Sequence, residues 1–210
     1  MSRGCSTGFF LTLIFIGLIS IVGCSHSKKV EEIATKDVVI LYTNDVHCAV
    51  DTGMGYAGVA FLEDYYTKEG CEVLLVDCGD AIQGEPIGTI SKGEHIVDIM
   101  NKMDYDVAIP GNHEFDYTIP QLTKLVEKAE AKYLGCNFKY LGEDPKAGLN
   151  VAPYAIHDYN GVKVGYVGIC TPESLFKSTP AYFMNEKGEY LYSFCQGNDG
   201  QDLYKAVQSA

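Results

Sequence analysis

The stretch that decides the fold is VLLVDCGD, residues 73–80. Its apolar, partly β-branched start is typical of a buried strand, and its end carries two acidic residues. The same arrangement occurs twice more, as VVILYT followed by NDVH at 38–47 and as VAI leading into GNHEFD at 107–116. An α/β sheet builds its site beyond the carboxyl ends of its strands, so three strand ends present Asp, His and Asn side chains there.

The spacing of apolar residues along the rest of the chain predicts alternating strands and helices. Strands are expected at 38–43, 72–77, 106–110 and 132–136, and helices at 57–68, 94–103 and 118–131. Asn160-Gly161 lies between two further strand-like runs, 154–159 and 162–169, and indicates a β-hairpin. The predicted fold class is a layered α/β fold with a mixed sheet. A helix that opens at 202–210 reaches the last residue without a stop signal, so we expect the chain to be the front part of a longer protein.

The composition narrows the classes of partner. The chain has 210 residues, 47% of them hydrophobic, which is enough for a packed core. A formal net charge of −12 disfavours a nucleic-acid polymer as partner and favours cations. The only arginine is Arg3, so the rest of the chain contains no guanidinium clamp for a phosphate. A strong grip on an anion must come from metals, from backbone N–H groups or from residues outside this chain.

The first 24 residues have the pattern of a secretory leader. An apolar stretch at 8–23 follows Arg3, ends in IVGC at 21–24 and gives way to a polar segment. This end resembles a bacterial lipobox, which implies a signal peptide at 1–24, Cys24 as the lipidated first mature residue, a linker at 25–37 and a catalytic region at 38–210. The alternative is an uncleaved membrane anchor. Both interpretations export the protein and tether it to a membrane, on its outer face or on the periplasmic side.

The polar residues at the three strand ends form a candidate ligand set for two cations. Asp45 and His47 are alternate residues, which point to the same side in an extended segment. Asp80 has two carboxylate oxygens that could bridge two metals, and Asn112 offers a neutral carbonyl oxygen to the second. Mixed nitrogen and oxygen ligands suit Zn, Mn, Fe or Co. Two such ions would activate water and neutralise phosphoryl oxygens, which predicts metal-assisted hydrolysis of a phosphoester.

His113 follows Asn112 directly and would project differently, toward a substrate. Asp116, three residues later, could hold the His113 ring and favour its cationic form. A cationic histidine could stabilise the transferred phosphoryl group or protonate the leaving oxygen. The role of Glu114 stays open between a base and a residue that supports the ligands.

Three motifs, NDVH at 44–47, GDAIQG at 79–84 and GNHEFD at 111–116, resemble those of the calcineurin-like metallophosphoesterases. Within this family, the motifs resemble more specifically those of the secreted 5′-nucleotidase branch, which includes UDP-sugar hydrolases and 2′,3′-cyclic-nucleotide phosphodiesterases. It implies a metallophosphoesterase-type layered α/β sandwich that acts on nucleotides or similar small phosphoesters. By the same resemblance, the first metal takes Asp45, His47 and Asp80, the second takes Asp80 and Asn112, and His113 with Asp116 forms the catalytic dyad.

The chain also departs from this family. Tyr42 and Pro110 replace a histidine and an aliphatic residue that are usual there, but neither position is a ligand. More important, the family supplies further ligating histidines from a later Gly-His-x-His segment, and a C-terminal domain that holds the nucleoside. Neither is present, and the remaining histidines, His26, His95 and His157, fit no ligand motif. About half of the metal site is therefore expected in this chain, with weakened metal affinity and turnover.

Two function classes follow from these observations. The first is an exported, membrane-anchored metallophosphatase of the 5′-nucleotidase type that scavenges nucleotides. The second is an inactive metal-binding lipoprotein, or a fragment whose missing part restores activity. A ligand-binding surface lipoprotein without chemistry is disfavoured by the three motifs. The identity of the metals, the choice among phosphoesters and the oligomeric state stay open.

Overall fold

The computed structural model describes residues 36–144, 147–149, 151–195 and 202–210. Its centre is a parallel sheet in the order β1-β2-β3-β4. The four strands are β1 (Val38–Thr43), β2 (Glu72–Asp77), β3 (Val107–Ala108) and β4 (Lys132–Tyr133). The bounds of β1 and β2 agree with the prediction, whereas β3 and β4 are two residues long and shorter than expected. Because all four strands are parallel, their carboxyl ends share one edge of the sheet.

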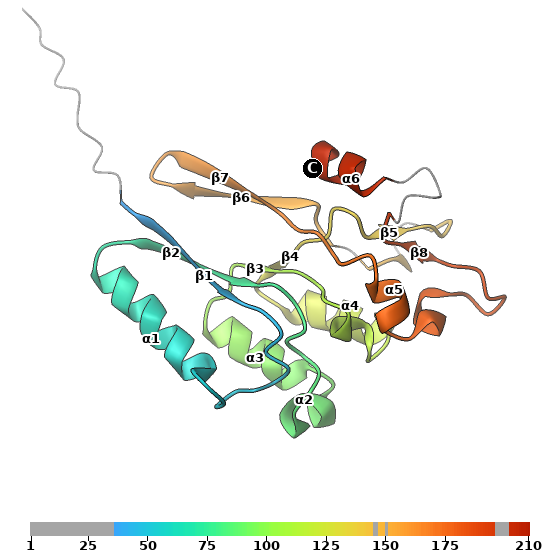
Figure 1. Cartoon of the computed structure of the whole chain (residues 1–210), viewed down its shortest axis with the longest axis horizontal. Helices are drawn as coiled ribbons and strands as arrows, with labels where there is room; N and C mark the ends of the chain where they lie inside the picture. The colour runs from blue at the N-terminus through green and yellow to red at the C-terminus, as the bar shows by residue number, and fades with distance from the viewer. Residues whose placement is uncertain (1–35, 145–146, 150, 196–201) are drawn as a thin grey trace, which may run out of the picture. The chain divides into compact units, whose positions relative to one another are not determined.

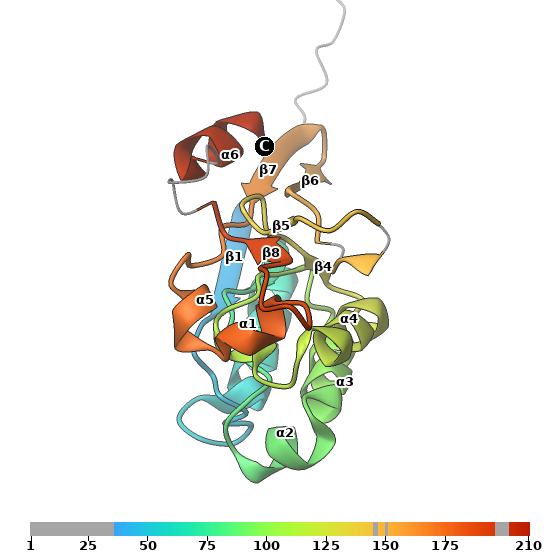
Figure 2. The same ribbon diagram turned by 90° about the vertical axis from the view of Figure 1, so that its right-hand side faces the viewer.

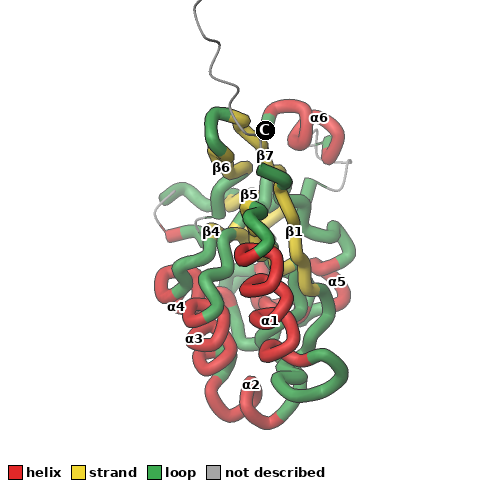
Figure 3. Tube along the Cα trace, turned by 90° about the vertical axis from the view of Figure 1, so that its left-hand side faces the viewer, coloured by secondary structure: helices red, strands yellow, loops and turns green. Residues whose placement is uncertain are grey.

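Helices cover one face of this sheet. They are α1 (Gly55–Lys68), α3 (Glu94–Lys102) and α4 (Ile119–Lys128), while the short helix α2 (Pro86–Ser91) lies at the end of α3 (Figure 1). Figure 1 shows α1, α3 and α4 on the same side of the strands, and Figure 3 shows them side by side in front of the sheet. Buried residues of the helices, such as Ile96 and Leu125, pack against Leu75 and Ala108 of the strands. The short helix α2 was not predicted, because six residues that begin with Pro86 carry too little periodicity.

The predicted hairpin covers the opposite face. Strands β6 (Tyr154–Tyr159) and β7 (Val162–Val167) pair in an antiparallel manner (Figure 1). Asn160 and Gly161 both have positive φ, 53° and 92°, as the tight turn between twisted strands requires. Ala155 packs with residues of the parallel sheet in one buried cluster. The layered α/β fold is confirmed, with parallel and antiparallel pairing divided between separate sheets in the described residues.

Later segments gather around Phe115, beyond the ends of the parallel strands. They include η1 (His113–Phe115), β5 (Lys139–Tyr140), α5 (Ser174–Lys177), η3 (Pro180–Phe183) and β8 (Tyr192–Ser193), whereas α6 (Leu203–Ser209) has no buried residue and lies outside this cluster. Strands β5 and β8 pair with each other, and Figure 2 shows them with α5 in front of the sheet. The fully buried ring of Phe115 lies 5.1–5.6 Å, between centroids, from those of Phe138, Phe183 and Phe194. This cluster anchors the segment that contains His113.

A buried asparagine joins these later segments. Asn137 is fully buried; its Nδ2 donates to the carbonyl oxygens of Cys170 and Phe194, and its Oδ1 accepts from the N–H of Cys170. Three hydrogen bonds satisfy the amide, as a buried polar group requires. Asn137 therefore joins the segments that contain Cys170 and Phe194.

The predicted leader at 1–24, with Cys24, lies outside the described residues, as does most of the linker at 25–37. Both stay predictions. Within the part of the chain that the structure describes, no helix is long and apolar enough to cross a membrane. Among the described cysteines, Cys48, Cys136, Cys170 and Cys195 are buried, as small apolar side chains often are, and Cys71 and Cys78 are half-buried.

Candidate metal centre

Three loops meet beyond the carboxyl ends of β1, β2 and β3. The first loop runs alongside the second, because the N–H groups of Asp45, His47 and Cys48 donate to carbonyls of the second loop at 2.9–3.0 Å. The acceptors of these bonds are the carbonyl oxygens of Gly79, Asp80 and Ala81. Backbone hydrogen bonds between the two loops thus continue past the ends of the strands, and His47 and Asp80 lie close together.

His47, Asp80 and His113 form the centre of the site. Each offers a ligand atom, and these atoms all lie within 4.8 Å of one another. The two imidazole rings meet edge to face, with centroids 4.9 Å apart. Ligands bound about 2.0–2.2 Å from one ion lie at most about 4.4 Å apart, so this group fits a divalent cation after a small adjustment. The structure places His113, predicted as catalytic, in one group with two predicted ligands.

Hydrogen bonds fix the orientation of both imidazole rings. Nδ1 of His47 lies 3.0 Å from the carbonyl oxygen of Gln83, and Nδ1 of His113 lies 2.7 Å from Oδ2 of Asp116. Since a carbonyl and a carboxylate only accept, each Nδ1 is assigned the hydrogen, and Nε2 is the nitrogen available to a cation or a phosphoryl oxygen. The predicted contact between His113 and Asp116 is present. Ser178, which sequence reasoning missed, donates to Oδ1 of Asp116 at 3.1 Å.

Asp45 lies beside His47 but is not a member of the group formed by His47, Asp80 and His113. The expectation of an extended segment is wrong, because Asp45 and His47 have φ values of 54° and 48° in the left-handed region. The loop curls, yet Oδ1 of Asp45 still lies 3.7 Å from Nε2 of His47. The Asp45 side chain is 58% exposed and accepts from the amide of Asn44. Asn112 is half-buried and immediately precedes His113 on the third loop.

Two glycines allow the second and third loops to touch. Gly79 has φ of 100°, and a Cβ there would stand 2.6 Å from the backbone nitrogen of Gly111. A Cβ on Gly111 would overlap the carboxylate of Asp80. Only glycine permits both the positive φ and this close approach. Asp80, which is 9% exposed, uses the space to accept the backbone N–H of His113 on Oδ1 at 2.7 Å.

Two buried carboxylates, Asp77 and Glu114, are neighbours in sequence of the predicted ligands. The motifs left the role of Glu114 open and assigned none to Asp77. Glu114 is 1% exposed and accepts backbone N–H groups from the second and third loops. Asp77 is 2% exposed and accepts from Oγ1 of Thr43 at 2.9 Å and from the N–H of Gly79 at 3.1 Å. Burial, and then the charge of Glu114, raises the pKa of Asp77 to about 7. Burial also raises the pKa of Glu114.

The remaining described histidines lie apart from this group, as predicted. His95 is exposed on α3, and the ring of His157 on β6 stacks with Tyr159 and packs edge to face on Tyr166. Neither is a member of the ligand group.

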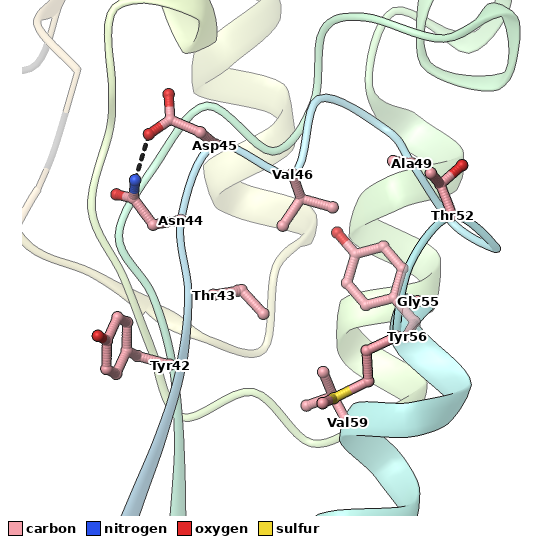
Figure 4. A pocket seen from close by; sticks show the side chains of 11 residues that line it. Tyr42, Thr43, Asn44, Asp45, Val46, Ala49, Thr52, Gly55, Tyr56 and Val59 are labelled. Atoms are coloured by element: carbon pink, nitrogen blue, oxygen red, sulfur yellow. Dashed lines mark hydrogen bonds between the residues drawn. The ribbon is translucent and has the colours of Figure 1, made fainter.

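A hollow of about 510 Å³ lies on the other side of the first loop. Figure 4 shows Thr43, Val46, Tyr56 and Val59 around it, while Asn44 and Asp45 point away on the far side of the chain. Asp45 is among the lining residues of the hollow, but His47, Asp80 and His113 are not.

Comparison with known proteins identifies the family, although no family model matches the chain. A snake venom 5′-nucleotidase from Gloydius brevicauda is 31% identical over 173 residues, which cover 73% of this chain and 29% of that protein. A 5′-nucleotidase from Rattus norvegicus is 32% identical over 160 residues, 69% of this chain and 28% of the relative. The solved structure of a calcineurin-like phosphoesterase from Bacillus subtilis gives a TM-score of 0.55 at 29% identity, and covers 66% of this chain and 49% of that one. The chain belongs to the metallophosphoesterase family of 5′-nucleotidases.

The metallophosphoesterase family membership confirms the resemblance seen in the three motifs. The chain corresponds to the N-terminal part of the family's domain structure and spans less than a third of the length of the two curated relatives. The activity of the whole protein is therefore a matter for proposal.

Proposed function

We propose that the protein is a metal-dependent phosphoester hydrolase that releases phosphate from nucleotides. The observation that carries this proposal is the group of His47, Asp80 and His113, whose ligand atoms lie within 4.8 Å of one another where three parallel strands end. The similarity to proteins named 5′-nucleotidases supports nucleoside monophosphates as substrates.

The proposed cofactor is a pair of divalent metal ions. The proposed ligands combine the imidazole of His47 with carboxylate and amide oxygens, and this mixture of nitrogen and oxygen suits Zn, Mn, Fe or Co. We assign Asp45, His47 and Asp80 to the first ion, and Asp80 with Asn112 to the second. When bound, such ions supply Lewis-acid activation of water and neutralise charge on the phosphoryl oxygens.

Side chains of the protein itself would protonate the leaving group. Nδ1 of His113 donates its hydrogen to the carboxylate of Asp116, and the hydroxyl of Ser178 donates to the same carboxylate. A second proton on Nε2 of His113 would then face the site, where it can be given to the leaving ester oxygen. Because Arg3 is the only arginine in the sequence, charge neutralisation of the phosphate would come from the metals, from backbone N–H groups or from residues outside this chain.

Export and membrane attachment form part of the same proposal. The apolar leader and Cys24 would place the mature protein outside the cytoplasm on a lipid anchor, where it would meet nucleotides for scavenging. A second candidate is a chain that binds metal without turnover until another segment completes the site. We keep this candidate because the match spans only 29% and 28% of the length of the two curated relatives.

The test is phosphate release from adenosine 5′-monophosphate by the purified chain with Mn²⁺ or Co²⁺, with and without EDTA. We expect release that EDTA stops and that Asp80→Asn abolishes, since this change removes a carboxylate charge at the centre. Asp98→Asn is a matched control, because Asp98 is an exposed carboxylate on α3 that pairs with Lys128 and is not a member of the ligand group. Release that resists EDTA or survives Asp80→Asn would contradict the proposal. Bound metal without release would favour the second candidate.

A further inference from the structure

We propose that Glu114 is a positioning residue that sets the metal ligands in place before any metal binds. This inference rests on the proposed metal centre. Glu114 directly follows His113, yet its side chain turns inward and is 1% exposed. A carboxylate buried to this degree needs compensating hydrogen bonds, and those of Glu114 come from backbone N–H groups of the site loops.

The two oxygens of Glu114 are each used twice. Oε2 accepts from the N–H of Asp80 at 2.8 Å and from that of Gly111 at 2.7 Å. Oε1 accepts from the N–H groups of Ala81 and Ile82 at 2.8 and 3.4 Å. Asp80 and Gly111 belong to different loops, so a single oxygen atom joins the loop after β2 to the loop after β3.

A second bond closes the arrangement into a ring. Oδ1 of Asp80 accepts the backbone N–H of His113 at 2.7 Å, while the N–H of Asp80 donates to Glu114. The predicted ligand Asp80 is therefore held from both its backbone and its side chain. Its φ of 59° lies in the left-handed region, which is unfavourable for a residue with a Cβ. Such a conformation persists only where surrounding contacts over-determine it, and Glu114 supplies these contacts.

The hydrogen-bond donors around Glu114 explain why a carboxylate is required at this position. All four partners of Glu114 donate, and an ionised carboxylate only accepts. In Glu114→Gln one oxygen becomes an NH₂ group, which would face two N–H donors whichever way the amide turns. The variant has nearly the same size as the wild type but loses two of the bonds and gains a repulsion between donors. It therefore tests the positioning of the loops with little change of volume.

The experiment measures Mn²⁺ affinity of the full purified chain by competition with a coloured chelator, together with amide hydrogen exchange of the metal-free protein. We expect Glu114→Gln to weaken Mn²⁺ binding about tenfold or more per folded molecule, the equivalent of about 1.4 kcal/mol. We also expect faster exchange at the N–H groups of Asp80, Ala81 and Gly111. Glu114→Asp, which keeps the charge but withdraws the oxygens by one methylene, should change both readouts in the same direction if the glutamine variant fails to fold.

The matched control is Asn101→Ala. It removes two hydrogen bonds, to the carbonyl oxygen of Lys128 and from the N–H of Glu130, and neither partner belongs to the site loops, so stability should fall while Mn²⁺ affinity per folded molecule stays within about twofold. Wild-type affinity and wild-type exchange in Glu114→Gln would overturn the inference. If the wild type itself binds no Mn²⁺, the proposed function fails, whereas the exchange rates at Asp80 and Gly111 still decide whether Glu114 positions the loops.

Discussion

The candidate site has two halves that differ in burial. The exposed half, residues 44–47, carries Asp45 and His47, whose side chains are 58% and 38% exposed. The buried half, residues 79–82 and 111–114, carries Asp80, which is 9% exposed and rests on the buried Glu114. In the exposed half, the backbone and the ring of His47 bond to the second loop, whereas Asp80 bonds to the third loop through both its backbone and its side chain. The difference suggests that the buried half sets the geometry of the site and that the exposed half adds ligands to it.

The largest effect should come from breaking the buried half at Gly111. Gly111→Ala would push a Cβ into the carboxylate of Asp80. We expect Mn²⁺ affinity to fall about a hundredfold, and overpacking of the loops to cost about 1–3 kcal/mol of the free energy of unfolding. Calorimetric titration and urea unfolding measure the two quantities.

Gly165→Ala is the control for this change. Gly165 lies on β7, and a Cβ added there would meet nothing within 4 Å, so affinity and stability should stay near those of the wild type. Equal Mn²⁺ affinity in Gly111→Ala and Gly165→Ala would show that the close contact between Gly111 and Asp80 does not set the site.

A smaller effect is expected from the exposed half. Asp45→Asn removes one charge near His47 without a change of size, and should weaken Mn²⁺ binding about tenfold. Because the side chain is largely exposed, the free energy of unfolding should change by no more than about 0.5 kcal/mol. The comparison of affinity with stability distinguishes the halves: a large loss of stability in Asp45→Asn would mean that the exposed half also supports the loops.

The smallest effect concerns the pH dependence of stability. Burial, with the charges of Glu114 and Asp80, raises the pKa of Asp77 to about 7, above its value in an unfolded chain. Protonation of the Asp77 carboxyl therefore stabilises the folded state at low pH. This contribution to the free energy of unfolding is lost as the pH rises through about 7. Asp77→Asn keeps an acceptor for the N–H of Gly79 and can donate to Thr43, but it cannot titrate.

Urea unfolding with EDTA at pH 5 and pH 8 tests this expectation. The wild type should lose more unfolding free energy between the two pH values than Asp77→Asn does, by on the order of 1 kcal/mol. Equal losses would show that Asp77 does not titrate in this range.

Sequence reasoning was most successful where local pattern decides structure. The apolar runs predicted the bounds of β1 and β2, and Asn160-Gly161 predicted the hairpin. The contact of His113 with Asp116 also followed from the sequence, because three residues separate them in one tight turn.

The features that sequence reasoning missed depend on contacts between loops. The left-handed backbone at Asp45 and His47 arises where the first loop bonds to the second; Asp and His tolerate this conformation, but their presence alone does not specify it. Glu114 could be recognised as an acidic neighbour of the ligands, but its four bonds come from residues about 30 positions upstream and from Gly111. Ser178 reaches Asp116 from 62 residues downstream. Such contacts become visible only when the sheet has brought the three strand ends together.

Both proposals depend on a metal centre that the three strand ends assemble around Asp80. An equilibrium titration of the full chain and of Asp80→Asn with Mn²⁺, followed by electron paramagnetic resonance of the free ion, tests for that centre without reliance on turnover. We predict saturable binding by the wild type and a loss of that binding in Asp80→Asn, with the far-ultraviolet circular dichroism unchanged. No saturable binding by the wild type, or equal binding by both proteins, would contradict the assignment of Asp80 as the central ligand.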